Sequence, residues 1–195
     1  MNEYLQNIEK SLQCDVPILT LIGTFAAIDI IAALDSEDGI TSTLKFKQWF
    51  EKFLPGYLGK ATSNDYHNFR CGLLHQLAGG RKGDSFHSLI FYPTESQIQA
   101  HLSVFSIENE KYFSIKLTEF VADVIKAIRK CVNESSNYEK HKDSIITLHP
   151  NGIPALNWIG TIHGKPPAVI ASAKMESMSP KKFLKKEKNK DQGAL

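Results

Sequence analysis

Apolar residues recur at helical spacing over much of this chain. Four segments place them at positions i, i+3, i+4 and i+7, which gathers them on one face of a helix. These segments are residues 3–13, 44–54, 64–78 and 117–132. Ser63 or Asn64 is expected to cap the third segment, and Gly79 and Gly80 are expected to end it. The pattern predicts amphipathic helices that pack around a shared core.

A fifth segment, residues 17–34, is apolar on every side and carries Asp29 as its only charge. Its length would allow a membrane span. The flanking residues are acidic, however, and no Lys or Arg stands near either end to orient a span. We therefore interpret this segment as the central buried helix of a bundle, and we expect no association with a membrane.

Between the third and fourth amphipathic segments the pattern changes to that of strands. Residues 101–107 and 111–117 look like two short strands, and the intervening Glu-Asn-Glu predicts a tight turn between them. Residues 86–92 suggest a possible third strand. We predict a mainly α fold, an up-and-down bundle of four to five helices with a small inserted β-hairpin near residues 86–116.

The bundle with its insertion is expected to occupy residues 1–133. Residues 134–195 then form a C-terminal extension, whose last ~20 residues are a flexible, basic tail. From Lys174 onward seven lysines stand against three acidic residues, a balance of +4, so the overall net charge of +2 leaves −2 on the rest of the chain. The body of the protein is therefore not a basic platform for nucleic acid, and the tail could add a salt-sensitive contact.

Three cysteines, Cys14, Cys71 and Cys131, stand far apart and lack paired CxxC spacing. This pattern is typical of free thiols in a reducing compartment and argues against a disulfide framework or a zinc knuckle. The histidines show no metal-ligand spacing, so we expect neither a metal nor another cofactor. The polar N-terminus shows no secretory signal, which makes the cytoplasm the expected location.

Arg70 and His75 are candidates for chemistry within the segment 64–78. On an ideal helix they point about 140° apart, with Arg70 beside the apolar stripe and His75 facing outward. An arginine near a core needs a carboxylate, because a buried charge without a partner is costly. For the same reason Asp29, in the apolar helix, needs a cation. We predict that Asp29 and Arg70 meet inside the bundle. The small Cys71 and Gly72 would leave the helix surface thin enough for a second helix or a phosphate backbone to approach.

The string FRCGLLHQ, residues 69–76, resembles the Arg-x4-6-His motif of the HEPN superfamily (higher eukaryotes and prokaryotes nucleotide-binding). Residues 27–34 are also similar to the second helix of such proteins, and the resemblance spans roughly Tyr4 to Val132. It implies a bundle of four to five helices that forms a homodimer with the motif at the interface. Many members are metal-independent endoribonucleases of toxin and antiviral systems, whereas others bind RNA, nucleotides or proteins without catalysis.

By this resemblance Arg70 and His75 are the expected catalytic pair. His75 would act as acid or base near neutral pH, and Arg70 would stabilise charge on the attacked phosphate. A polar residue commonly follows the arginine in active members, whereas this chain has Cys71, whose thiol is a weak hydrogen-bond partner. The alternative is a catalytically silent module that binds RNA, a nucleotide or a partner protein, such as an antitoxin or a defence protein.

Three further residues are candidates for RNA binding. Arg81 and Lys82 lie among glycines directly after the motif helix, where they could contact an RNA backbone or simply belong to a solvated, helix-ending turn. Their spacing is not that of a phosphate-binding Walker loop. His67 lies about 80° from His75 on the helix, so it could assist phosphate binding or be a solvated histidine.

Overall fold

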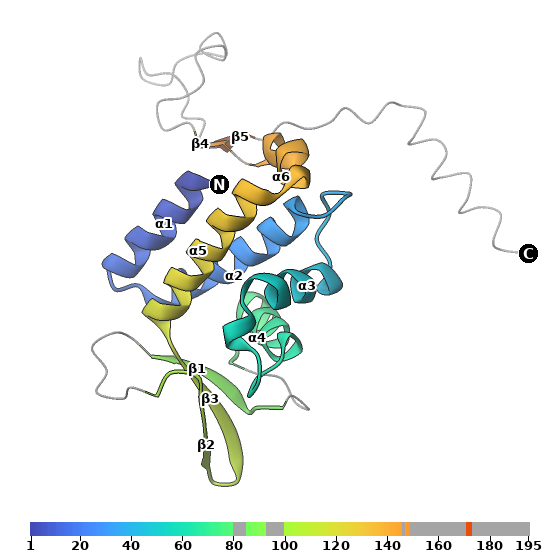
Figure 1. The fold of residues 1–195 in the computed structure, drawn as a ribbon. Coiled ribbons are helices and arrows are strands. Elements are labelled where there is room, and N and C mark those ends of the chain that lie inside the picture. The colour runs from blue at the N-terminus through green and yellow to red at the C-terminus, as the bar shows by residue number, and fades with distance from the viewer. Residues whose placement is uncertain (80–84, 93–99, 146, 149–170, 173–195) are drawn as a thin grey trace, which may run out of the picture. The chain divides into compact units, whose positions relative to one another are not determined.

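The computed structural model describes residues 1–79, 85–92, 100–145, 147–148 and 171–172 (Figure 1). The chain divides into two compact units, Met1–Lys142 and Asp143–Leu195. A short 3-10 turn, η2 (Lys142–Ser144), crosses the boundary. In the second unit, β4 (Thr147–Leu148) pairs antiparallel with β5 (Ala171–Ser172). The predicted basic tail lies outside the described residues.

The first unit contains all of the helices that are described. They are α1 (Asn2–Gln13), α2 (Pro17–Leu34), α3 (Thr43–Phe53), the 3-10 turn η1 (Pro55–Tyr57), α4 (Ser63–Gln76), α5 (Leu117–Glu134) and α6 (Ser136–His141). Each of the five predicted helices is present, whereas α6 was not predicted. Ser135 caps α6 by accepting from the N–H of Tyr138 at 3.0 Å, and Asn137 Nδ2 donates to the carbonyl of Asp35 at 2.9 Å. The bond from Asn137 holds α6 against the end of α2.

The apolar helix α2 lies at the centre of the bundle, in contact with α1, α3, α4 and α5 (Figure 1). Phe25, Ile28 and Ile31 on this helix are completely buried. Among the described residues, α2 is the one helix whose length and composition would allow a membrane span, and half of it is buried inside the protein. Its apolar character is therefore explained in large part by packing against the surrounding helices.

The predicted fold class is wrong in its β part. Instead of a small inserted hairpin, the first unit contains a three-stranded mixed sheet formed by β1 (Ser88–Tyr92), β2 (Ser103–Ile107) and β3 (Glu110–Lys116). β3 is central, antiparallel to β2 and parallel to β1. The unit thus combines helices and a sheet in an α/β arrangement. Only the β2–β3 pair is a hairpin, joined at Glu108 and Asn109, which both have positive φ (51° and 69°) as a tight two-residue turn requires.

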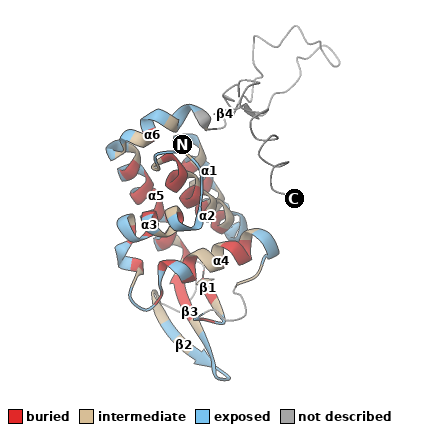
Figure 2. Cartoon of the chain, turned by 90° about the vertical axis from the view of Figure 1, so that its right-hand side faces the viewer, coloured by how far each residue is buried: buried red, intermediate tan, exposed pale blue. Residues whose placement is uncertain are grey.

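The sheet belongs to the core because one of its faces packs on the helices. Phe113 and Ile115 of β3 are 1% and 0% exposed. The ring of Phe91 in β1 lies 5.3 Å from Phe120 of α5 and 6.1 Å from Phe25 of α2. Figure 2 shows buried residues on the strands where they meet the bundle and exposed residues towards the hairpin tip. β3 also runs directly into α5, so the sheet and the bundle share one continuous apolar interior.

Candidate functional site

The motif helix α4 begins with a capping box. Thr62 Oγ1 accepts from the N–H of Asp65 at 3.3 Å, and the Asp65 carboxylate accepts from the N–H of Thr62 at 2.8 Å. The cap is therefore Thr62, one residue before the predicted Ser63 and two before Asn64, because an acidic side chain stands three positions after it. On the inner face the ring of Tyr66 is completely buried, which fixes the rotation of the helix.

Directly after α4 the chain folds back against the last turns of this helix. Leu77 adopts a left-handed φ of 52°, and the chain folds back so that the N–H of Ala78 donates to the carbonyl of Gly72 at 3.1 Å. A Cβ on Gly72 would lie 2.8 Å from the Ala78 carbonyl oxygen. The thin surface predicted at Cys71 and Gly72 is therefore not open to a second helix or a phosphate, since both residues are buried. Leu77, directly after the helix, is 72% exposed.

The predicted pairing of Asp29 with Arg70 is confirmed. Arg70 Nε donates to Asp29 Oδ2, and Arg70 Nη2 forms an ion pair with the same oxygen. Both side chains are largely buried, with 19% of Arg70 and 12% of Asp29 exposed. Arg70 Nη1 lies 3.7 Å from the sulfur of Cys71. The guanidinium is thus held from two sides, by α2 and by its own helix.

The surroundings of the pair keep Arg70 charged. Burial lowers the pKa of Arg70, but the Asp29 carboxylate and the Cys71 sulfur raise it, and the result lies above the usual value. For Asp29, burial raises the pKa, while Arg70 and a protonated His75 lower it in part, so the pKa remains above its usual value.

His75 lies in the last turn of α4 and is exposed to solvent. Among the described residues, no hydrogen bond joins His75 to Arg70. The fold therefore brings Asp29, Arg70 and His75 into one neighbourhood, but one copy of the chain does not by itself bring the arginine and histidine into contact.

His67 packs between α3 and α4. Its ring lies 5.4 Å from the ring of Phe46, edge to face, and its Nε2 atom lies 3.7 Å from the sulfur of Cys71. The residue is half-buried, so it is not a solvated histidine. Arg81 and Lys82 lie outside the described residues, and their predicted role in RNA binding stays a prediction.

One feature near the ion pair was missed by sequence reasoning, which placed helices around all of α2. The start of this helix is open, with Ile18 and Leu19 62% and 63% exposed. A half-buried apolar stripe continues from there at intervals of four residues and ends beside Asp29. Its members are Ile22, Ala26 and Ile30. A helix that is apolar on all sides has no polar face to reveal which side stays open.

Two small hollows lie away from α4, around the C-terminal ends of α2 and α3. Asp35 and Lys52 line both, joined by Trp49 in one and by Cys131 in the other. Neither is lined by Arg70. Among the described residues, no three His, Cys, Asp or Glu side chains gather in a group that could hold a metal ion.

Comparison of the chain with protein-family models, with curated proteins and with solved structures finds no match.

Proposed function

We propose that this protein is a metal-independent endoribonuclease of the HEPN type, which acts in the cytoplasm as a homodimer. The observation that carries the proposal is the pair formed by Asp29 and Arg70, whose arginine shares helix α4 with the exposed His75. A buried ion pair adds little net stability compared with apolar packing. A carboxylate that holds one guanidinium near a solvent-exposed imidazole is better explained by a positioning role.

The residue types match the chemistry of RNA cleavage. His75 in one copy removes the proton of the ribose 2′-OH, whose oxygen then attacks the neighbouring phosphorus. Arg70 stabilises the charge that develops on the phosphate oxygens. His75 of the second copy donates a proton to the leaving 5′-oxygen. The products are a 2′,3′-cyclic phosphate and a free 5′-hydroxyl.

A homodimer supplies the second histidine that one copy lacks. The open stripe of α2 offers an apolar surface for it, which begins at Ile18 and Leu19 and ends beside Asp29. Exposed apolar side chains grouped in this way are typical of contact surfaces. Pairing of two such stripes would bring the two ion pairs and the two exposed histidines together around one cleft.

The test uses single-stranded RNA and the full chain in EDTA. We expect wild type to cut the RNA and leave 2′,3′-cyclic phosphate ends, and His75→Ala and Arg70→Ala to lose this activity. Gln76→Ala changes the exposed neighbour of His75 and is the matched control, which should cut like wild type. The double variant Ile18→Glu/Leu19→Glu should be monomeric in light scattering and inactive. Cutting that persists in His75→Ala would overturn the proposal.

A second candidate function is a catalytically silent module that binds RNA, a nucleotide or a partner protein. The observation that favours it is that Nε and Nη2 of Arg70 are already engaged by Asp29, while Cys71 stands where active members commonly carry a polar group. Retained RNA binding without cleavage in either wild type or His75→Ala would favour this function. In a toxin or defence system, the partner would be an antitoxin or defence protein that covers the cleft.

A further inference from the structure

The outer face of the sheet carries a row of rings that the helices do not cover. Phe105 of β2 and Tyr112 of β3 are directly opposed in the strand register, with ring centroids 5.6 Å apart and planes within 14° of parallel. The ring of His87, just before β1, lies 5.2 Å from that of Tyr112. His87 is exposed and the other two are half-buried. We call these three residues the ring row.

The ring row is not part of the apolar core. Side chains alternate along β3, so Tyr112 points away from the face on which Phe113 and Ile115 are buried against the bundle. Phe105 and Tyr112 are only half-buried, so part of each ring is available for contact with a partner. Burial of such large rings against a partner is strongly favourable. Nucleic-acid bases stack on rings of this kind, with little regard for base identity, because every base has a flat π face.

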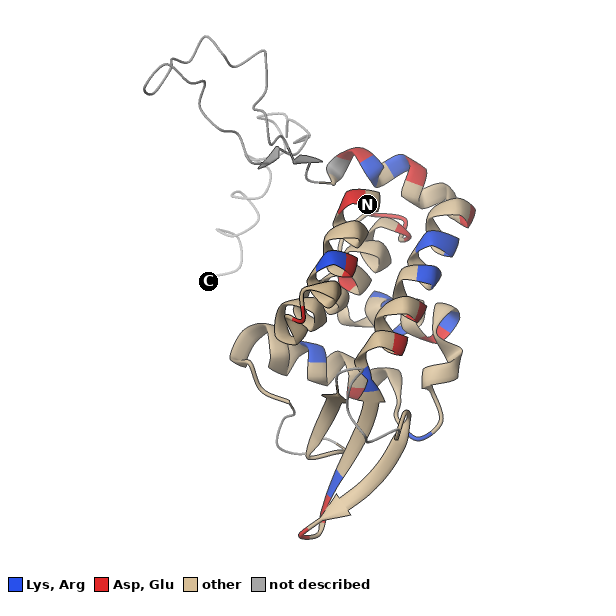
Figure 3. Cartoon of the chain, turned by 90° about the vertical axis from the view of Figure 1, so that its left-hand side faces the viewer, with Lys and Arg blue, Asp and Glu red and all other residues tan. Residues whose placement is uncertain are grey.

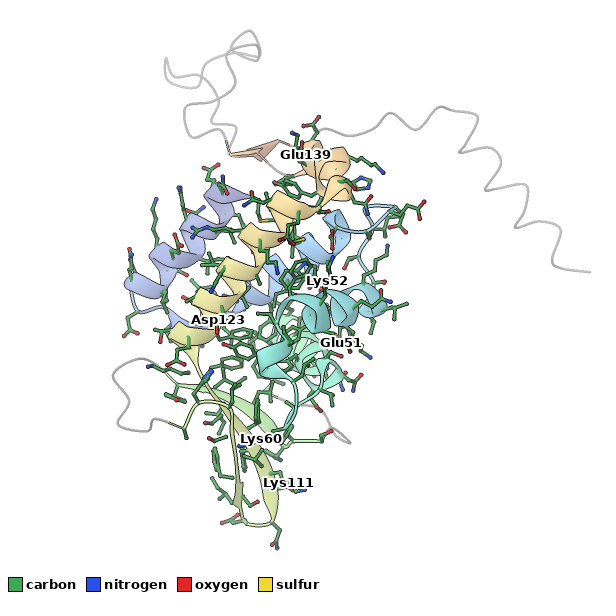
Figure 4. All side chains as sticks on the ribbon, viewed as in Figure 1. Glu51, Lys52, Lys60, Lys111, Asp123 and Glu139 are labelled. Atoms are coloured by element: carbon green, nitrogen blue, oxygen red, sulfur yellow. The ribbon has the colours of Figure 1, made fainter. Side chains whose placement is uncertain are left out.

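Charges beside the sheet favour a nucleic acid over an apolar protein segment. Lys60 and Lys111 are exposed, and neither has a carboxylate partner among the described residues. Lys60 Nζ donates to the carbonyl of Leu102 at 3.3 Å, directly before β2. Figure 4 shows both lysines beside the hairpin. The Lys60 ammonium complements the phosphates of a single strand whose bases stack on the rings, whereas Lys111 stands two residues before Phe113 and so lies on the opposite face of β3.

The carboxylates of the sheet limit where the strand can run. Glu108 lies in the hairpin turn and Glu110 begins β3, so the acidic residues are at the tip, as Figure 3 shows. Glu110 Oε2 also lies 3.6 Å from Nδ1 of His87. A phosphate chain is repelled at the tip and favoured towards the bundle, where Lys60 lies.

The ring row ends next to the motif helix. The carbonyl of Gly79, four residues after His75, accepts from the N–H of Leu89 at 3.1 Å and from the Ser88 hydroxyl at 3.0 Å. Ser88 directly follows His87. The hydrogen bonds at Gly79 therefore join the last turn of α4 to the end of the ring row.

We propose that Phe105, Tyr112 and His87 form a platform on which the bases of single-stranded RNA stack, with Lys60 contacting the phosphates. The platform directs the strand towards the end of α4, where His75 lies. The identity of the strand as RNA rests on the proposed function. The stacking itself requires no catalysis.

The test measures binding separately from cleavage. A fluorescein-labelled oligonucleotide of 2′-O-methyluridine lacks the attacking hydroxyl, so its anisotropy reports binding alone. We expect Phe105→Ala and Tyr112→Ala each to weaken binding by about 5-fold or more, the usual effect of losing one stacked ring. Phe105→Trp keeps a ring and should bind at least as tightly as wild type. Val104→Ala, at a 40% exposed position on the opposite face of the same strand, is the control and should bind like wild type.

Salt dependence tests the lysines. For single strands, each phosphate contact adds about 0.7 to the slope of log affinity against log salt, so Lys60→Gln should flatten it by about that amount. Lys111→Gln, on the opposite face of β3, is the matched control and should leave the slope unchanged. A 5-iodouridine oligonucleotide should photocrosslink to Phe105 or Tyr112 in wild type. This experiment does not depend on the folding of any variant.

Three results would overturn the platform. The first is unchanged binding in Phe105→Ala and Tyr112→Ala, and the second is crosslinking elsewhere on the chain. The third is an absence of oligonucleotide binding together with a changed oligomeric state in the ring variants, which would assign this face to protein contact. The proposed nuclease fails differently, by leaving unmodified RNA uncut while the ring-dependent binding of the uncleavable strand remains.

Discussion

Asp29 in the middle of α2 holds the guanidinium of Arg70 in α4 through a single carboxylate oxygen, Oδ2, which contacts both Nε and Nη2. Compared with apolar packing, a contact of this kind orients the arginine more than it stabilises the fold. We expect Asp29→Asn to lower RNA cleavage at least about tenfold, and also to lower the free energy of unfolding by about 3 kcal/mol, because it leaves the largely buried Arg70 guanidinium without a carboxylate. The Nε–H resonance of Arg70 in a ¹⁵N NMR spectrum should be protected from exchange in wild type and lost in the variant. An unchanged resonance and full activity would contradict the positioning role.

The raised pKa of Asp29 predicts a specific dependence of stability on pH. Burial outweighs the opposing effects of Arg70 and His75, so the native pKa lies above the usual 3.8. A group of this kind contributes stability that is fully present below the unfolded pKa and is lost as the pH rises through the native pKa. Urea unfolding between pH 3.5 and 6.5 should show wild type losing stability relative to Asp29→Asn as the pH rises above about 4. Curves that stay parallel over this range would contradict the shift.

The place of the sheet in the core can be tested with two isoleucines of the same hairpin. Ile115 is completely buried against the bundle, whereas Ile107 at the tip is 50% exposed. We expect Ile115→Ala to lower the free energy of unfolding by about 2–4 kcal/mol, because it leaves a cavity, and Ile107→Ala to change it by less than about 0.5 kcal/mol. Chemical denaturation measures both. Equal, small effects would mean that the hairpin is merely an appendage.

Gly72 should reverse the usual effect of replacing a helical glycine. In an open helix, Gly→Ala stabilises by about 0.5–1 kcal/mol. At Gly72 the new Cβ would meet the carbonyl oxygen of Ala78 at 2.8 Å, so we expect a loss of about 1–3 kcal/mol instead. Gly56 in η1 has no atom within 4 Å of an added Cβ, so Gly56→Ala is the matched control. Thermal melting of both variants measures the difference. An unaltered melting temperature for Gly72→Ala would contradict the close approach of the Ala78 carbonyl to Gly72.

The three cysteines should differ sharply in reactivity. Cys14 is exposed, whereas Cys71 and Cys131 are buried. Burial also raises the pKa of the Cys131 thiol to about 11, which leaves little thiolate near neutral pH. A colorimetric thiol reagent should therefore modify one thiol rapidly in the native protein and three after denaturation. Cys14→Ser should abolish the rapid phase, and rapid modification of Cys131 would contradict its placement.

The helices could be predicted because their apolar stripes repeat with the helical period over several turns. The Asp29–Arg70 pair could be predicted because two lone charges in apolar surroundings need each other. The mixed sheet could not be predicted, since the pattern of a strand does not tell which neighbour it pairs with or in which direction. The sequence also does not tell which part of a structure approaches a glycine. Gly72 does permit a close approach, but the approaching backbone is the chain's own at Ala78.

The two pairings of β3 also imply an order of assembly. Ile107 and Glu110 are partners across a two-residue turn, whereas Ser88 and Tyr112 are partners across 24 positions of sequence. The nearer pairing closes the smaller loop and loses less chain entropy, so hairpins form within about 1–10 μs while distant pairings form later. We expect the hairpin to nucleate the sheet and β1 to join it afterwards. The last turn of α4, tied to β1 through Gly79, would then reach its final position late in folding.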